Sequence, residues 1–420
     1  MPPTSTVPEA APFEIEVKSA VLGLRARLGA IVGKHVSPLF QPIELHKRLG
    51  IDRRLGWSIS RLLQDEDLLE AALHYPGQAA IRRFLSKAGC DEVAREGVLH
   101  AVDAFERMVS RHAGDQATFE SLIAASASTD LARTRELEQR QAAFSANGYI
   151  YGVRARLQLA LYVLAPHADG ETIDVAVVRG YVGMHRLSPN RSWPIMARRW
   201  ASEDGTPSGS ARFCALDPRE EADATAAPLL REFCSPTDMR IEAVQLPGGI
   251  REYRLPPAGV GLGQSQVCVI GERVVQAGPR FGTREDPALT LSPAIRTPVE
   301  ALLFDCIVHD ELAQEMAAPE LMLTSDVNRL AGQVAPVEER DRLESLGAVR
   351  HLGVASAAAV REHRYEQYGA MVEAVLGTLG ADRQRYQLHR AWLPFPPLAS
   401  TANVTFGLPS RRGEERGIEG

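Results

Sequence analysis

The stretch that decides the fold of the N-terminal part runs Pro42-Ile-Glu-Leu-His-Lys-Arg-Leu-Gly-Ile-Asp-Arg-Arg-Leu-Gly-Trp-Ser-Ile-Ser-Arg-Leu-Leu63. Pro42 suits the first turn of a helix, where its missing N–H group is not needed. Gly50 can take the left-handed backbone that ends a helix, and Asp52 can cap a second helix by accepting backbone N–H groups. The pattern therefore predicts a short helix, a glycine turn and a second helix. Five apolar side chains are expected to form the small core between them: Leu45, Leu49, Ile51, Leu55 and Ile59.

Further helical patterns lie on both sides of this pair. Apolar residues recur at spacings of three and four from Phe13 to Val32, which is typical of one face of a helix. The segments 68–73, 77–88 and 90–112 are also expected to be helical. We therefore predict an all-α, helix-turn-helix-like domain over residues 13–125.

The ends of the chain differ in composition from the rest. Residues 1–12 are rich in proline and poor in apolar side chains, so we expect a disordered tail. They lack the basic start and apolar run of a signal peptide. Residues 410–420 are charged and glycine-rich, and we expect a second mobile tail there.

The C-terminal part has a different pattern of polar and apolar residues. A charged, helix-prone run predicts a linker helix over residues 126–150, and short alternating segments follow it. Residues 156–164 and 172–182 alternate around a His-Ala-Asp-Gly turn, which indicates a β-hairpin. We expect a mixed α+β domain over 151–409, of one or two subdomains, so the fold class is α+β multidomain.

Two apolar segments of this part carry further expectations. Residues 299–309 form an apolar run that fits either a helix or a buried strand. Residues 357–379 give the clearest helical pattern, and Gly380 is expected to end that helix.

Composition limits the class of protein. The chain has 420 residues, 45% of them hydrophobic, and a formal net charge of −6, as a folded protein would have. The five cysteines are odd in number and never at CxxC spacing, which argues against a disulfide framework or a thiolate zinc site. No stretch reaches 18 apolar residues, so no membrane span is expected. These features predict a cytoplasmic protein with reduced thiols.

Cofactor and catalytic motifs are poorly matched. The stretch from Gly29 to His35 is one residue too short for a phosphate-binding loop, and His35 replaces the required Ser or Thr. Glycines 259, 261 and 263 lack a clear strand before them or a helix after them. His309, Asp310 and Glu311 are consecutive, so on a helix they point in different directions and rarely share one ion. We therefore expect no cofactor and no metal, and assign no catalytic residue.

The charge distribution favours a role for the helix pair. Residues 14–64 carry nine Lys or Arg against four acids, whereas residues 65–136 carry eight against thirteen. Arg53 and Arg54 lie at the start of the second helix, where donors can meet bases or phosphates. Arg82 and Arg83 either extend this surface or belong to a solvated helix face. The residues predicted to bind DNA are Lys47, Arg48, Arg53, Arg54, Ser58 and Arg61.

The segment from Glu44 to Asp52 resembles the turn region of helix-turn-helix transcription regulators. The resemblance covers residues 42–63 and has two departures. The family prefers Ala at the position of His46. It prefers a β-branched or other apolar residue at the position of Gly56, and glycine weakens a helix by about 1 kcal/mol relative to alanine.

The resemblance implies a DNA-binding transcriptional regulator, with residues 151–409 as a sensor or oligomerisation domain. It also implies a small-molecule effector, and a homodimer on paired half-sites. Three alternatives stay open. The helix pair fits an ordinary helical hairpin with a solvated basic face. The chain fits a non-catalytic scaffold that binds a protein partner through its N-terminal helices. It also fits an enzyme with an unfamiliar site in residues 151–409.

Overall fold

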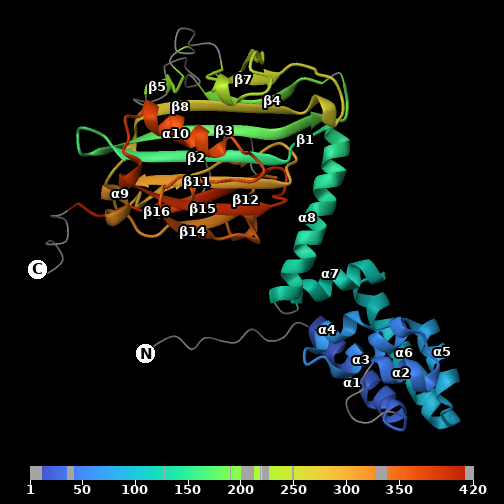
Figure 1. Cartoon of the computed structure of the whole chain (residues 1–420). Coiled ribbons are helices and arrows are strands. Elements are labelled where there is room, and N and C mark those ends of the chain that lie inside the picture. The colour runs from blue at the N-terminus through green and yellow to red at the C-terminus, as the bar shows by residue number, and fades with distance from the viewer. Residues whose placement is uncertain are drawn as a thin grey trace, which may run out of the picture. The chain divides into compact units, whose positions relative to one another are not determined.

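The computed structural model describes most of the chain, and Figure 1 draws its elements. The described residues are 12–35, 42–126, 129–189, 191–199, 212–217, 219, 227–247, 250–327 and 338–411. The predicted tail at 1–12 lies outside them except for Pro12, and the predicted tail at 410–420 lies outside them beyond Arg411. The chain divides into two compact units, 1–138 and 139–420.

The first unit is helical and the second is mostly strands, so the expected mixed α+β class is confirmed. The helices of the first unit are α1 (Pro12–Val32), α2 (Pro42–Leu49), α3 (Arg53–Gln64), α4 (Leu68–Leu73), α5 (Gln78–Ala88), α6 (Glu92–His112) and α7 (Gln116–Ser126). The division between the units falls inside α8 (Thr129–Tyr151).

The helical unit has a continuous aliphatic core. Val21, Leu24 and Leu28 of α1 are fully buried, as the predicted apolar stripe requires. They belong to one cluster with Phe84 of α5 and Phe105 of α6. The five apolar residues expected between α2 and α3 are all buried in the same cluster. The helix pair is therefore an integral part of this core.

The second unit is built on an eight-stranded sheet in the order β14-β15-β11-β2-β3-β8-β5, with β1 paired to β3. Its strands are β1 (Val153–Arg154), β2 (Leu157–Pro166), β3 (Thr172–Arg186), β5 (Arg212–Ala215), β8 (Gln266–Pro279), β11 (Ala301–His309), β14 (Val349–Val354) and β15 (Tyr386–Pro394). The predicted hairpin is β2 and β3. Strands β2 and β11 pair in parallel, and the other neighbours in the sheet pair antiparallel.

Among its described residues, the second unit also has two smaller sheets and two α-helices after α8. The five-stranded sheet contains β9 (Ala288–Leu291), β10 (Ala294–Ile295), β12 (Glu320–Ser325), β13 (Arg342–Leu343) and β16 (Ser400–Gly407). The three-stranded sheet has the order β4 (Trp193–Arg199), β7 (Ile250–Leu255) and β6 (Glu242–Leu246). The helices are α9 (Asp310–Glu315) and α10 (Tyr368–Thr378), and α10 lies against the large sheet (Figure 1).

The large sheet is covered on both faces, which explains its almost uninterrupted apolar strands. On one face, Leu159 and Leu303 belong to a cluster with Met371 of α10. On the other face, Phe304 belongs to a cluster with Val404 of the five-stranded sheet. Strands buried on two sides lose the polar–apolar alternation that would otherwise identify them.

The structure decides between the two readings of residues 299–309 and corrects the helix expected over 357–379. The first segment is the buried strand β11. In the second, helix begins only at Tyr368, because the preceding residues turn to make tertiary contacts. Val360 is fully buried, and the hydroxyl of Tyr365 donates a hydrogen bond of 2.9 Å to the carbonyl of Phe233. Gly380, at φ +62°, follows the end of α10 as expected.

Two general features of the described residues bear on function. All five cysteines carry free thiols, and Cys234, Cys268 and Cys306 are buried. None of the helices placed by the structure has the length and apolar character required to span a membrane.

Candidate nucleic-acid interface

The turn between α2 and α3 follows directly from two residues. Gly50 has φ +61°, a conformation that a side chain would strain. The carboxylate of Asp52 accepts hydrogen bonds from the backbone N–H groups of Arg54, at 2.6 Å, and Leu55, at 3.3 Å. These are the first amides of α3, which have no partner within the helix. The sequence therefore fixes both where α2 ends and where α3 begins.

The two residues that depart from the helix-turn-helix pattern both have local roles. A Cβ atom on Gly56 would lie 3.0 Å from the carbonyl oxygen of Pro42, so glycine permits the close approach of α3 to α2. The Nδ1 atom of His46 lies 2.6 Å from the carbonyl oxygen of Ile51, to which the imidazole N–H donates. This contact ties α2 to the turn. Both departures thus stabilise the helix pair itself.

The six residues predicted to contact DNA fall into two groups. Arg48 and Arg61 are already engaged. Arg48 pairs with Glu44 at 3.1 Å and donates to the carbonyl of His35 at 2.8 Å. Arg61 pairs with Asp65 at 2.9 Å.

The other group is available to a ligand. Lys47, Arg53 and Arg54 are exposed and make no ion pair with any residue that the structure describes. Ser58 is half-buried on α3. These three cations need not break an ion pair within the protein before they bind an anion. This group therefore has the potential for anion binding.

A cleft of about 810 Å³ lies beside α3 in the helical unit. It brings Arg54 and Ser58 together with Arg83 of α5. Arg83 is exposed and, like Arg54, has no ion pair within the described part of the chain. Lys47, Arg48, Arg53 and Arg61 are not among the residues that line the cleft. The structure thus assembles only part of the predicted set there, and it adds an arginine from a separate helix.

The carboxylates around the cleft are occupied by other groups. Asp52 caps α3, and Glu106 accepts hydrogen bonds from the Tyr75 hydroxyl at 2.8 Å and the Gln78 amide at 3.3 Å. Glu120 pairs with Arg135 at 3.1 Å. Hydrogen bonds from neutral donors leave the charge of a carboxylate in place, so the cleft is mixed in charge. Its lining has four carboxylates, with Asp115 as the fourth, and the two arginines, which have no ion pair among the described residues.

An exposed aromatic ring completes the cleft. The side chain of Trp57 is 47% exposed, and its ring meets that of His74 edge-on at a centroid distance of 4.9 Å. Burial lowers the pKa of His74, and its contact with Asp65 at 3.2 Å acts in the opposite direction. His74 is therefore neutral at pH 7 and adds no charge beside Trp57.

Sequence reasoning missed Trp57 and undervalued Arg83. Trp57 lies outside the set of residues predicted from the sequence to bind DNA, and about half of its side chain faces solvent. The only signal for Arg83 was its place in an Arg-Arg pair, since nothing in the sequence shows that α5 begins beside α3. Proximity of two helices that are not consecutive is a tertiary property, and helical periodicity does not encode it.

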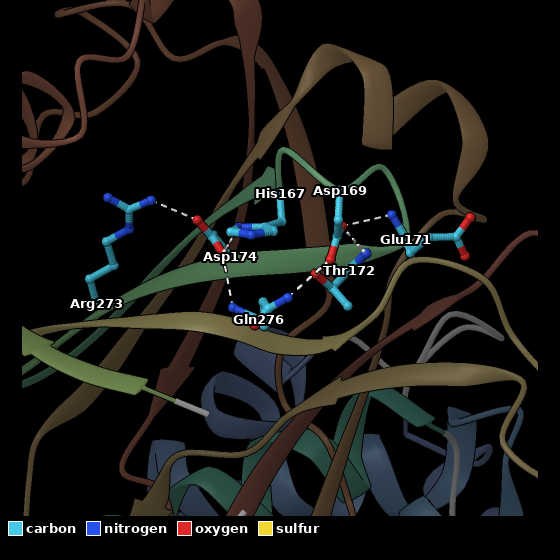
Figure 2. A network of polar contacts seen from close by, with 7 residues as sticks. All are labelled: His167, Asp169, Glu171, Thr172, Asp174, Arg273 and Gln276. Carbon is cyan, nitrogen blue, oxygen red and sulfur yellow. Dashed lines mark hydrogen bonds and ion pairs between the residues drawn. The ribbon is translucent and has the colours of Figure 1, made fainter. Parts of the chain in front are cut away.

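One polar network of the second unit has a structural role. At the turn between β2 and β3, Asp169 accepts hydrogen bonds from the amides of Glu171 and Thr172, at 2.8 and 2.9 Å (Figure 2). Asp174 is bound by His167 at 2.9 Å, by Arg273 at 2.6 Å and by the amide of Gln276 at 2.9 Å. Every partner belongs to this hairpin or to β8, so the network fastens three neighbouring strands. It leaves no carboxylate free for chemistry.

The sequence matches no protein-family model, and no curated protein matches it. Among the described residues, no group of three or more His, Cys, Asp or Glu side chains is placed to hold a metal ion. A functional assignment therefore rests on the geometry and charge of the surfaces above.

Proposed function

We propose that the helical unit binds nucleic acid, with duplex DNA as its target, and that the chain acts as a transcriptional regulator. The observation that supports this most directly is that Arg54 of α3 and Arg83 of α5 line one cleft, both without an ion-pair partner among the described residues. Phosphate contacts from such arginines supply most of the affinity of DNA-binding proteins. Lys47 and Arg53 extend the positive surface on either side of the turn.

Helix α3 would enter the major groove, which is about 12 Å wide and admits one helix. Its first residues, Arg53 and Arg54, would then meet base edges or phosphates, and Ser58 would follow one turn later. Regulators of this kind bind paired half-sites as dimers, so a homodimer is part of the proposal. The strand-rich unit would act as sensor or oligomerisation domain.

The alternative of a protein-binding scaffold has less support from the same surface. A partner helix needs exposed apolar neighbours, and Leu55 is only 8% exposed. The exposed Trp57 is flanked instead by polar side chains, with His74 at its edge and the guanidinium of Arg61 6.0 Å from its ring. An aromatic ring beside a guanidinium group suits nucleic acid better than an apolar partner.

The test is a salt series of binding to random-sequence duplex DNA. Wild type is compared with R53A/R54A and with R54A/R83A. Each phosphate contact contributes about 0.9 to the slope of log affinity against log salt concentration, so each double variant should lower that slope by about two. The matched control is R27A/R95A. It removes the same charge from two exposed arginines of α1 and α6 that do not line the cleft.

Two results would contradict the proposal. One is no binding by folded wild type at about 50 mM salt, where non-specific binding is strong. The other is an equal loss of affinity in R27A/R95A, which would mean that overall charge, and not this surface, attracts DNA. Circular dichroism of each variant separates loss of binding from loss of fold.

A further inference from the structure

The strand-rich unit contains a cleft that nothing so far accounts for. Its volume is about 490 Å³, within the usual range of small-molecule sites. One wall belongs to the large sheet. The other is formed by β4 of the three-stranded sheet and by residues 292–296.

The sheet wall is set by strand register. Tyr181 of β3 lies directly opposite Gln158 of β2 on one side and Cys268 of β8 on the other. Arg179, two residues along β3, lies opposite Ile270. Side chains two apart on a strand share a face, so these five line one surface, and all five border the cleft.

The facing wall is apolar and held in place. Trp193, Ile195 and Met196 of β4 border the cleft. The indole N–H of Trp193 donates a hydrogen bond of 2.9 Å to the hydroxyl of Thr297, which is fully buried. An aromatic and aliphatic wall fixed by a buried hydroxyl is suited to the apolar body of a ligand.

The charged side chains at the cleft differ in whether they already have an ion-pair partner. Arg296 pairs with Asp326 at 2.8 Å, and Glu252 pairs with Arg254. Arg179 is exposed, and its only hydrogen-bond partner in the described structure is the hydroxyl of Tyr162, at 3.4 Å. The guanidinium also lies 6.0 Å from the centroid of the Tyr162 ring. Neither neutral contact cancels its charge, so it can still take a carboxylate in its two-pronged geometry.

Gln158 adds a neutral polar group to the wall of the cleft. Gln158 is only 6% exposed, and its Nε2 donates to the carbonyl of Ala294 at 3.0 Å, which fixes the orientation of the amide. Its Oε1 then has no partner among the described residues. An ionised carboxylate has no proton to donate to this oxygen, so the carboxylate of a ligand would lie at Arg179 and away from Gln158.

We propose that this cleft binds a small apolar carboxylate, with its body between β4 and the sheet and its carboxylate on Arg179. The free cation at the edge of an apolar slot selects this chemistry over a fully apolar or a cationic ligand. The proposal does not depend on nucleic-acid binding by the helical unit. It supplies a class of ligand for the strand-rich unit.

The experiment uses the full chain and two probes, decanoate and 1-decanol, which share an alkyl body and differ in charge. Binding is measured by calorimetry, with the intrinsic tryptophan fluorescence of the chain, to which Trp193 contributes, as a second readout. Wild type should bind decanoate below about 1 mM and should bind decanol more weakly. R179Q should weaken decanoate binding about tenfold, the value of one charged hydrogen bond, and leave decanol binding unchanged.

Two further variants separate the cleft from general effects. A197W places a large ring at an exposed residue of β4 that borders the cleft, and it should abolish binding of both probes. R284Q removes an exposed arginine that does not border the cleft, and it should bind like wild type. The proposal is overturned if folded wild type binds neither probe, if A197W binds both normally, or if R179Q and R284Q bind decanoate equally.

Discussion

The guanidinium group of Arg390 forms two hydrogen bonds of 2.7 Å with the carboxylate of Asp305, directly across the β11–β15 pair. Asp305 is fully buried, and the hydroxyl of Tyr368 on α10 donates a third bond of 2.7 Å to it. One carboxylate thus joins two strands and the helix that covers them. A buried charge is tolerated only with such complete pairing.

R390A should therefore destabilise the strand-rich unit strongly. Removing one partner of a buried pair leaves an uncompensated charge, which costs about 3–5 kcal/mol. Native-state hydrogen exchange at the amides of β11 and β15 measures the change. The matched control is R350A, at the exposed position opposite Arg390 on β14, which should change stability by less than about 0.5 kcal/mol. Equal protection in both variants would mean that the pair contributes little.

G56A should destabilise the helical unit although alanine favours helix. The new Cβ would lie 3.0 Å from the carbonyl oxygen of Pro42, and crowding of this kind costs about 1–3 kcal/mol. At Gly23 in α1 the same change meets only the Arg27 side chain at 3.9 Å, so G23A should be stabilising by up to about 1 kcal/mol. Thermal unfolding of the two variants distinguishes them by sign. A stabilised G56A would show that α2 and α3 are not closely packed.

D52A should weaken α3 at its first turn. Loss of the cap leaves the amides of Arg54 and Leu55 without their acceptor and costs about 1 kcal/mol. D52N keeps an acceptor oxygen and should stay within a few tenths of wild type. Urea unfolding followed by circular dichroism measures both. Equal losses in D52A and D52N would point to the charge of Asp52, rather than to its cap, as the source of stability.

The free energy of unfolding should decrease as the pH is lowered, because of the buried His389. Burial lowers the pKa of His389 to about 4, and the neighbouring His351 acts in the same direction. The unfolded chain binds this proton more readily, so the contribution is complete above about pH 6.5 and is lost as pH falls toward 4. Across this pH window, the unfolding free energy should depend less on pH in H389Q than in wild type. Equal slopes in H389Q and wild type would contradict this prediction.

The features that the sequence predicts correctly are those set by interactions between residues close together in the chain. The left-handed Gly50, the cap at Asp52 and the hairpin of β2 and β3 are all present, because each depends on residues close together in the chain. The extent of α10 was overestimated, because contacts of Val360 and Tyr365 with distant residues outweigh helix propensity.

The candidate sites depend still more on tertiary structure. Of the arginines proposed to bind DNA, Arg54 was named from its place at a helix start. Its partner Arg83 could be recognised only from the cleft that they share. The second cleft joins β2, β3 and β8 to β4, and no motif marks any of its residues.

The parallel pairing of β2 with β11 has a consequence for biosynthesis. Gln158 must wait for Leu302 before the centre of the sheet can close, whereas α1 finds its main partner, α6, within the helical unit. A chain still emerging from the ribosome would present the apolar β2 with an unpaired edge during that interval. Such edges attract other strands. Nascent chains truncated before β11 should therefore depend on chaperones more than chains that end after α7.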